Sequence, residues 1–555
     1  MRRWCLAALL ALTMLGAGGA AAAERRMVVA AHPLAAEAGI EVLRAGGNAV
    51  DAMVAIQAVL GLVEPQSSGL GGGAFLVYYD AASGELTTFD GRETAPAAAT
   101  EDYFLGMDGE PLPFWEAVVG GRSVGVPGTP KLLDVVHARY GARDWAELLQ
   151  PALQLAEAGF EVTPRLAQSV EGARELDRFE ATRAYFFANG EALRAGATLA
   201  NPAYAETLRR LQAARSAPFY SGDIAAAIVA TTTAEGGVLT LADFEAYEVM
   251  ERAPVCADYR GVEVCGMGPP SSGALTVGQI LGLLAHVDIA RLGYGVEAAH
   301  LIAEASRLAF ADRALYMADA DFVDVPVSGL LDPVYLTVRA QLIDRDAAAR
   351  DARAGLPPRR NLPAFAPQDQ PEPPGTSHFV VVDAAGNALS MTTTIESGFG
   401  SRLMTNGFLL NNELTDFSFR PEINGRPVAN RVEGGKRPRS SMSPTIVMRD
   451  GAPYVLTGSP GGSRIIAYTT MSLLGMLDWG LEPQQAVELG HVVNRGGATD
   501  LEEGTEAASF AAELRERGHE VDIRELTSGL HAVMIRDDVL LGGADPRREG
   551  VVRGD

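Results

Sequence analysis

Residues 371–394 read PEPPGTSHFVVVDAAGNALSMTTT, and this stretch decides how the rest of the chain is interpreted. It begins inside a segment, 355–375, that contains seven prolines and few large apolar residues, a composition typical of a surface linker. After Thr376 the pattern changes to two apolar strands joined by a turn, over 377–394. The sequence therefore predicts an exposed tether that runs directly into a buried hairpin, with Gly375 as the last tether residue.

A threonine at such a junction can act as a nucleophile if the bond before it is cut. Inside a chain its hydroxyl has no neighbouring base, whereas cleavage before Thr376 frees an α-amino group whose pKa of about 7.7–8.0 suits it for that task. Gly375 has no side chain to hinder attack of the hydroxyl on its carbonyl carbon. A Thr-Ser pair at the start of a strand is also ordinary structure, so this pair alone does not establish the chemistry.

Two glycine-rich segments lead into different kinds of element. The loop 457–462, TGSPGG, leads into an expected helix over 463–479, so its backbone N–H groups can form an oxyanion hole at a helix N-terminus. A tight turn that needs glycine for steric reasons has the same sequence. The run GLGGG at 69–73 leads into an expected strand instead, which argues against a dinucleotide-binding loop.

Several polar residues lie beside expected strands or apolar runs and suit a zwitterionic ligand. Arginine and hydroxyl groups bind carboxylates, whereas acidic groups bind an ammonium. Arg92, Ser440 and Ser441 are candidates for the first task, and Glu413 and Asp416 for the second. Taken singly, each of them is most often solvated surface.

The composition limits the class of protein and its location. The chain has 555 residues and a net charge of −24, which argues against nucleic acid and anionic membrane surfaces as partners. Residues 1–23 are typical of a secretory signal, with two arginines, a short apolar run and small residues at the end; a poorly cleaved membrane anchor is the alternative. We expect an exported protein, periplasmic or secreted. The eight histidines show no zinc-site spacing, and no metal or cofactor is expected.

Two cysteines remain after the signal. Cys256 and Cys265 flank the expected turn DYRG at 258–261, so they face each other if the hairpin is symmetric. An oxidising compartment permits a disulfide there. Two free buried thiols fit the sequence equally well.

Elsewhere the hydrophobic periodicity predicts helices and short strands. Helices are expected over 34–44, 49–63, 145–157 and 296–315, and strands over 75–79, 86–89, 445–448 and 454–456.

Together these segments resemble the γ-glutamyltransferase (glutathione hydrolase) family of N-terminal-nucleophile hydrolases. The resemblance covers nearly the whole mature chain. Its most specific matches are GTSHF at 375–379, LLNNE at 409–413, SSMSPT at 440–445 and TGSPGGSR at 457–464.

The resemblance implies an α+β fold, the four-layer αββα sandwich, built from two fragments of one precursor. Cleavage between Gly375 and Thr376 would give a large fragment, 24–375, that ends in the proline-rich linker, and a small fragment, 376–555. The two would remain associated as a heterodimer.

The resemblance also implies a role for each matched residue. Thr376 would be the nucleophile of self-cleavage and turnover, and Thr394 would hydrogen-bond its amino group. Gly461 and Gly462 would form the oxyanion hole. A substrate's α-carboxylate would contact Arg92, Ser440 and Ser441, and its α-amino group would contact Glu413 and Asp416. This chain departs from many members in having Glu396 where they have asparagine near the α-amino group, and in a shorter lid segment, 417–437.

The implied activity is cleavage of the γ-glutamyl amide of glutathione and related compounds through an ester on Thr376, with transfer to water or to an acceptor amine. Glutaryl or cephalosporin acylases of the same fold are one alternative. A glutaryl group has no α-amino nitrogen, so the acids would lack a partner beside it, which favours γ-glutamyl substrates. An uncleaved, non-catalytic binding protein is the other alternative.

Overall fold

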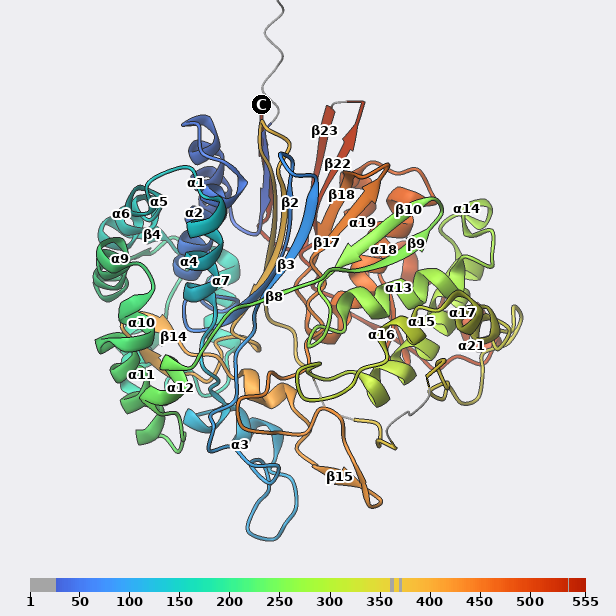
Figure 1. The fold of residues 1–555 in the computed structure, drawn as a ribbon, viewed down its shortest axis with the longest axis horizontal. Helices are drawn as coiled ribbons and strands as arrows, with labels where there is room; N and C mark the ends of the chain where they lie inside the picture. Colours follow the sequence, from blue (N-terminus) through green and yellow to red (C-terminus); the bar gives the residue numbers. More distant parts are fainter. Residues whose placement is uncertain (1–25, 360–363, 369–371, 538) are drawn as a thin grey trace, which may run out of the picture.

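Two stacked β-sheets form the centre of the molecule in the computed structural model, which describes residues 26–359, 364–368, 372–537 and 539–555 (Figure 1). Neighbouring strands are antiparallel throughout both sheets. The first sheet has the order β24 (Val551–Gly554), β1 (Met27–Ala30), β11 (Ser377–Val382), β12 (Ala388–Thr394), β2 (Gly73–Asp80), β3 (Glu85–Gly91) and β8 (Met250–Arg252). The second has the order β23 (Val539–Ala544), β22 (His531–Arg536), β18 (Ala452–Gly458), β17 (Thr445–Arg449), β10 (Val262–Gly266) and β9 (Val255–Tyr259).

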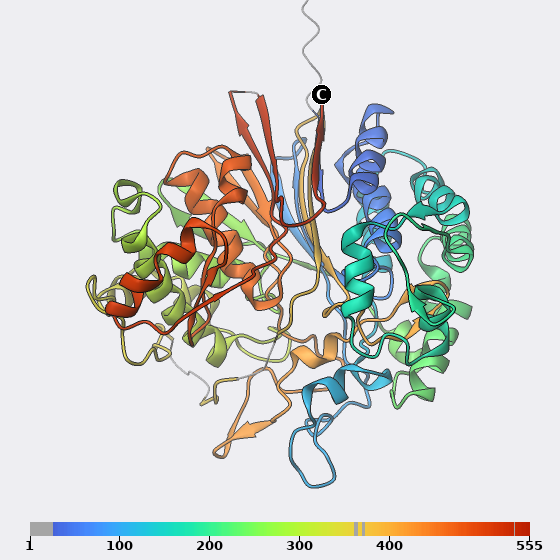
Figure 2. The same ribbon diagram turned by 180° about the vertical axis from the view of Figure 1, so that it is seen from behind.

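Helices cover the outer face of each sheet, as the two opposite views show (Figures 1 and 2). The layer on the first sheet includes α1 (Pro33–Arg44), α2 (Ala49–Val63), α4 (Thr129–Tyr140), α5 (Trp145–Leu148), α6 (Gln150–Ala158), α7 (Pro164–Gly172), α9 (Pro202–Ala214) and α11 (Asp223–Ala234). The layer on the second sheet includes α13 (Gly273–Leu284), α15 (Val296–Tyr316), α17 (Pro333–Ala340), α18 (Ile465–Leu477), α19 (Pro483–Glu488) and α21 (Ala511–Glu516). The expected four-layer αββα sandwich is confirmed.

Strand β11 shows why its sequence is apolar without interruption. Phe379 and Val381 pack toward the helices of the first layer, whereas Val380 and Val382 pack between the two sheets. Because successive side chains of a strand point to opposite faces, a strand covered on both sides needs apolar residues at every position. The run FVVV therefore indicates a central strand of a layered fold.

Both sheets contain strands from either side of Thr376. In the first sheet β11 lies between β1 and β12, and β2 continues the sheet beyond β12. In the second sheet β10 pairs with β17. A break before residue 376 would therefore leave the two parts joined by β-ladders and by a shared core.

Most expected elements are present, with two differences. The helix expected over 145–157 is two helices, α5 and α6, which meet at Leu149. The helix expected from 463 begins as the 3₁₀ turn η3 (Gly462–Arg464) before α18.

The expectation of a surface linker over 355–375 is wrong in part. Ala366, Gln368 and Glu372 are buried, because they pack against the rest of the protein rather than projecting into solvent. Residues 360–363 and 369–371, and the expected signal at 1–23, lie outside the described residues.

The cysteines lie on the hairpin formed by β9 and β10. Cys256 and Cys265 are directly opposite in the strand register, and their sulfurs are bonded to each other. Among the described residues, no helix has the length and apolar character needed to cross a membrane.

Candidate active site

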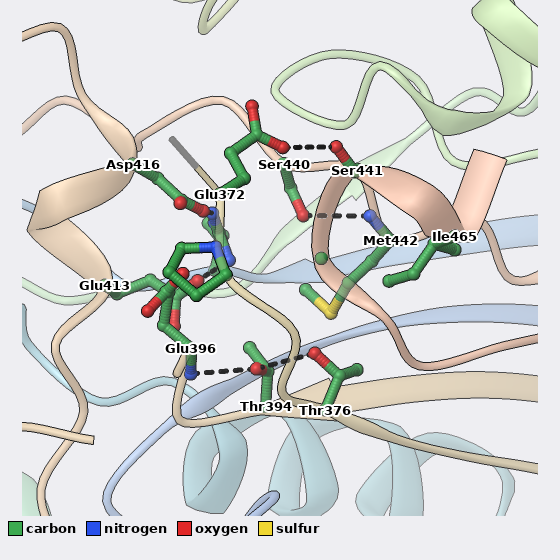
Figure 3. Close-up of a pocket in the computed structure, with 13 residues that line it drawn as sticks. Glu372, Thr376, Thr394, Glu396, Glu413, Asp416, Ser440, Ser441, Met442 and Ile465 are labelled. Carbon is green, nitrogen blue, oxygen red and sulfur yellow. Dashed lines mark hydrogen bonds and ion pairs between the residues drawn. The ribbon is translucent and has the colours of Figure 1, made fainter. Parts of the chain in front are cut away.

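Thr376 and Thr394 lie side by side where two neighbouring strands end (Figure 3). Thr376 directly precedes β11, and Thr394 is the last residue of β12, the antiparallel neighbour of β11. Their side-chain Oγ1 atoms are 3.0 Å apart. The Thr394 oxygen also accepts a hydrogen bond from the N–H of Glu396 at 2.8 Å, which fixes that hydroxyl beside Thr376.

The backbone at the Gly375–Thr376 bond is crowded and strained. Thr376 has φ = 83°, a left-handed conformation that a β-branched residue adopts at a cost of about 1–3 kcal/mol. Its N–H donates to the carbonyl of Ser67 at 3.2 Å, and its carbonyl accepts from Nη1 of Arg548 at 3.0 Å. A Cβ added at Gly375 would lie 1.6 Å from the backbone oxygen of Glu396, so only glycine fits there.

The candidate carboxylate ligand Arg92 is engaged by acidic residues. It follows β3 and is 1% exposed, and the 3₁₀ turn η2 (Glu413–Asp416) supplies its two ion-pair partners. Its Nη1 contacts Glu413, its Nη2 lies 2.6 Å from Oδ2 of Asp416, and its Nε donates to the carbonyl of Pro438 at 3.2 Å. Arg92 thus holds in place the two acids that were expected to bind an ammonium.

Four buried carboxyl groups surround this single guanidinium. Burial raises the pKa of Asp416 to about 8, against the opposing charge of Arg92, and the charge of Glu413 raises it further. Burial likewise raises the pKa of Glu413, again against Arg92. The pKa of Glu396 is raised well above its usual range by burial and then by Asp416, and that of Glu93 by burial and then by Glu413. The cluster has four carboxyl groups and only the positive charge of Arg92 beside them. A positively charged ligand would therefore stabilise the ionised carboxylates.

A second, separate group of residues holds a carboxylate of the chain itself. Oγ of Ser441 donates to Glu372 at 2.6 Å, and Nη2 atoms of Arg313 and Arg439 lie 2.8 and 2.9 Å from Oε1 of Glu372. Burial opposes ionisation of Glu372, but the two arginines outweigh it and hold its pKa at about 2. The neighbouring Ser440 accepts a hydrogen bond from the N–H of Met442 at 3.1 Å.

The end of the linker fills the site in the uncut chain. The remaining cavity beside Thr376 has a volume of only about 20 Å³, room for one water molecule, and Glu372 and Pro373 line it. Gly461 and Gly462 both have positive φ, 137° and 59°. A Cβ at Gly462 would lie 2.4 Å from the carbonyl oxygen of Pro373, so the linker covers the expected oxyanion loop.

Nearly all residues selected from the sequence meet at this cavity. Its described lining includes Arg92, Thr376, Thr394, Glu396, Glu413, Asp416, Ser440, Ser441 and Gly462. Gly461 and Gly375 adjoin lining residues in the chain without lining the cavity themselves. The disulfide cysteines and the expected lid segment 417–437 contribute no lining residue.

Arg313 and Arg439, which hold the linker's carboxylate, were not among the residues expected from the sequence. Arg439 directly precedes Ser440 in the motif RPRSS, so its position in a matched segment was an available signal. Arg313 lies on α15, and nothing local connects it to Glu372, 59 residues later. Within the described ranges, no group of three or more histidine, cysteine, aspartate or glutamate side chains is arranged to hold a metal ion.

The family comparison agrees with this geometry. The model of the family described as gamma-glutamyltranspeptidase matches residues 35–554. The chain belongs to this family of enzymes. Among its relatives, the glutathione hydrolase proenzyme of Bacillus subtilis (strain 168) is 38% identical over 542 residues, which are 95% of this chain and 91% of that protein.

Two solved structures show the range of relatives with this fold. The cephalosporin acylase from Bacillus halodurans superposes with a TM-score of 0.85 at 28% identity, and the match covers 96% of each chain. The gamma-glutamyltranspeptidase of Helicobacter pylori has a TM-score of 0.57 at 37% identity, over 58% of this chain and 94% of that chain. The enzyme therefore shares its architecture with both transpeptidases and acylases.

Proposed function

We propose that this family member is a precursor that cuts itself between Gly375 and Thr376 and then hydrolyses or transfers the γ-glutamyl group of glutathione and related compounds. One observation carries the proposal: Thr376, at a strained backbone position, lies between two different surroundings. On one side are buried carboxyl groups, including Glu396 and Asp416, and on the other is Ser441, which binds a carboxylate. A γ-glutamyl group carries an ammonium and a carboxylate on the same carbon, and these two surroundings match them.

Self-cleavage begins with attack of the Thr376 hydroxyl on the carbonyl carbon of Gly375. A C–O bond forms, the peptide C–N bond breaks, and the hydroxyl proton passes to the departing nitrogen. The product is an ester between Gly375 and the Thr376 side chain. Water hydrolyses this ester to give a free carboxylate on Gly375 and a free amino terminus on Thr376.

Turnover uses the same hydroxyl with the new amino group as its base. The amino group takes the proton of Thr376 Oγ1 as that oxygen attacks the γ-glutamyl carbonyl carbon. Amides of Gly461 and Gly462 stabilise the oxyanion, and Thr394 orients the nucleophile. The amine leaves with the proton, and water or an acceptor amine then takes the γ-glutamyl group from the ester.

The substrate's two charged groups are assigned to the two halves of the cavity. Glu396, Glu413 and Asp416 bind the α-ammonium, and the electrostatic cost of their burial is relieved when it enters. Ser440 and Ser441 bind the α-carboxylate once Glu372 has moved, because a cavity of about 20 Å³ admits no γ-glutamyl group. Arg92 fixes the acids and contacts the α-carboxylate only if one of its present partners releases it.

The assembly follows from the shared sheets. The fragments 24–375 and 376–555 remain together as a heterodimer, since each contributes strands to both sheets. The enzyme is exported, to a periplasm or the medium, where the disulfide persists.

The likeness to the cephalosporin acylase supports one second candidate, an acylase acting on glutaryl-type side chains. Intact mass and kinetics together test the choice. We expect two fragments, the smaller beginning at Thr376, and a kcat/KM at least tenfold higher for γ-glutamyl-p-nitroanilide than for glutaryl-p-nitroanilide, because one charge-assisted contact is worth about 1.5–3 kcal/mol. Thr376→Ala should remain one inactive chain. The reverse substrate preference favours the acylase, and an uncut, inactive wild-type chain favours a binding protein.

A further inference from the structure

A larger pocket lies on the other side of the bond to be cut. It has a volume of about 450 Å³, within the range of small-molecule sites, and both Gly375 and Ser67 line it. The other walls come from α7, from the loop 397–402, from Trp115 in α3 (Phe114–Val118) and from the C-terminal segment. Pro373 lines both this pocket and the cavity beside Thr376, so the two spaces are separated by the linker.

The described lining of this pocket contains four arginines, Arg165, Arg174, Arg402 and Arg548, and no acidic side chain. Arg402 is 3% exposed and donates to the backbone carbonyls of Arg174, at 3.1 Å, and Gly400. Arg548 donates to the carbonyls of Thr376 and Thr527. Carbonyl oxygens satisfy the donors of an arginine without neutralising its charge.

Among the described residues, the carboxylates that act on these arginines lie outside the pocket lining. Glu396 and Glu175 act on Arg402, and Glu64 and Asp545 act on Arg548. Oε1 of Glu64 is 3.5 Å from Nε of Arg165, and Oε2 of Glu64 accepts a hydrogen bond from Oγ of Ser377. Burial lowers the pKa of Arg548, and the charge of Arg165 lowers it further.

Arg174 and Arg402 both lie against the ring of Trp115, 5.9 and 5.6 Å from its centre. The two printed hydrogen bonds of Arg402 use its Nε and Nη1, so its Nη2 is the nitrogen that can donate to a ligand.

The chemistry at Thr376 places a leaving group next to this pocket. In the proposed reaction the amino group of Thr376 gives its proton to the departing amine, so that amine must stand beside the nitrogen of Thr376. This nitrogen now donates to the carbonyl of Ser67, a residue of the pocket wall. An amine that leaves, or an acceptor amine that arrives, therefore has the arginine pocket as its nearest open space.

We infer that the arginine pocket is the subsite for the leaving amine and the acceptor, and that it binds amino acids or short peptides through their terminal carboxylate. The inference rests on the proposed function and extends it. A bidentate arginine–carboxylate pair fixes both position and orientation, so the carboxylate sets the distance between the amine and Thr376.

Paired acceptors provide the test. Transfer from γ-glutamyl-p-nitroanilide to alanylglycine is compared with transfer to alanylglycinamide, at equal concentrations of unprotonated amine. In the wild-type enzyme kcat/KM for the carboxylate acceptor should exceed that for the amide by about tenfold. The ratio cancels any general change in the activity of a variant.

Substitutions at the pocket should change this ratio. Arg174→Gln, at an exposed position, should lower the ratio of kcat/KM for the carboxylate acceptor to that for the amide acceptor about threefold. Arg402→Gln, at a buried position, should lower this ratio about tenfold. Both variants should keep the wild-type melting temperature. Arg174→Lys should restore part of the preference. Arg194→Gln removes an exposed arginine paired with Glu191, outside the pocket lining, and should leave the ratio unchanged.

The two failures are distinguishable. A wild-type enzyme that cleaves the donor but shows no preference, or whose preference survives both substitutions, overturns the subsite and leaves the proposed function intact. An enzyme that releases no p-nitroaniline from the donor overturns the proposed function itself.

Discussion

Gly375→Ala should block self-cleavage while the protein still folds. The added Cβ would lie 1.6 Å from the backbone oxygen of Glu396, and it must move to at least 3.0 Å. The displacement of about 1.4 Å falls on the residue whose carbonyl carbon is attacked. Because misplacement of a reacting group by about 1 Å can cost a factor of about 100, we expect cleavage to slow by at least that factor.

The assay follows freshly synthesised precursor from a cell-free reaction by intact mass over time at neutral pH. Gly398→Ala is the matched control, since it adds the same methyl group in the nearby loop where nothing lies within 4 Å of the new Cβ. Circular dichroism should give the same helix content for both variants. Cleavage of Gly375→Ala as fast as that of Gly398→Ala would show that crowding at the junction does not position the carbonyl carbon of residue 375.

Three further predictions concern the site and its surroundings. Thr394→Val removes the hydroxyl 3.0 Å from that of Thr376 and should slow both self-cleavage and turnover by about 10- to 100-fold, measured by intact mass and p-nitroanilide release. Because Asp416, with its pKa raised to about 8, gains its charge only as pH rises, the kcat/KM ratio of γ-glutamyl to glutaryl substrate should climb from about pH 6 to about pH 8, before the substrate loses its own α-ammonium charge; the climb should be absent in Asp416→Asn. Replacing Cys256 and Cys265 by alanine opens a loop with a sequence separation of 9 and should lower the free energy of unfolding by about 2–3 kcal/mol with kcat/KM unchanged; a loss of activity in the folded variant would contradict this separation of roles.

The sequence was sufficient wherever the information is local. Gly375 and Thr376 adjoin in the chain, and the uninterrupted run after them indicates a strand buried on both faces. The loop before α18 has its glycines at the positions where the backbone takes positive φ, 137° at Gly461 and 59° at Gly462. Such features depend on neighbouring residues, so they can be interpreted without knowing the path of the chain.

Only the tertiary structure decided which charges meet. Arg92 pairs with Glu413 and Asp416 across more than 300 residues, and Glu372 occupies a carboxylate-binding group instead of lying in solvent. The arginine pocket likewise gathers positions 165, 174, 402 and 548 from three separate parts of the chain. An ion pair forms according to distance and burial, and both are set by how the layers pack. A charged residue's sequence neighbours therefore do not reveal its partner.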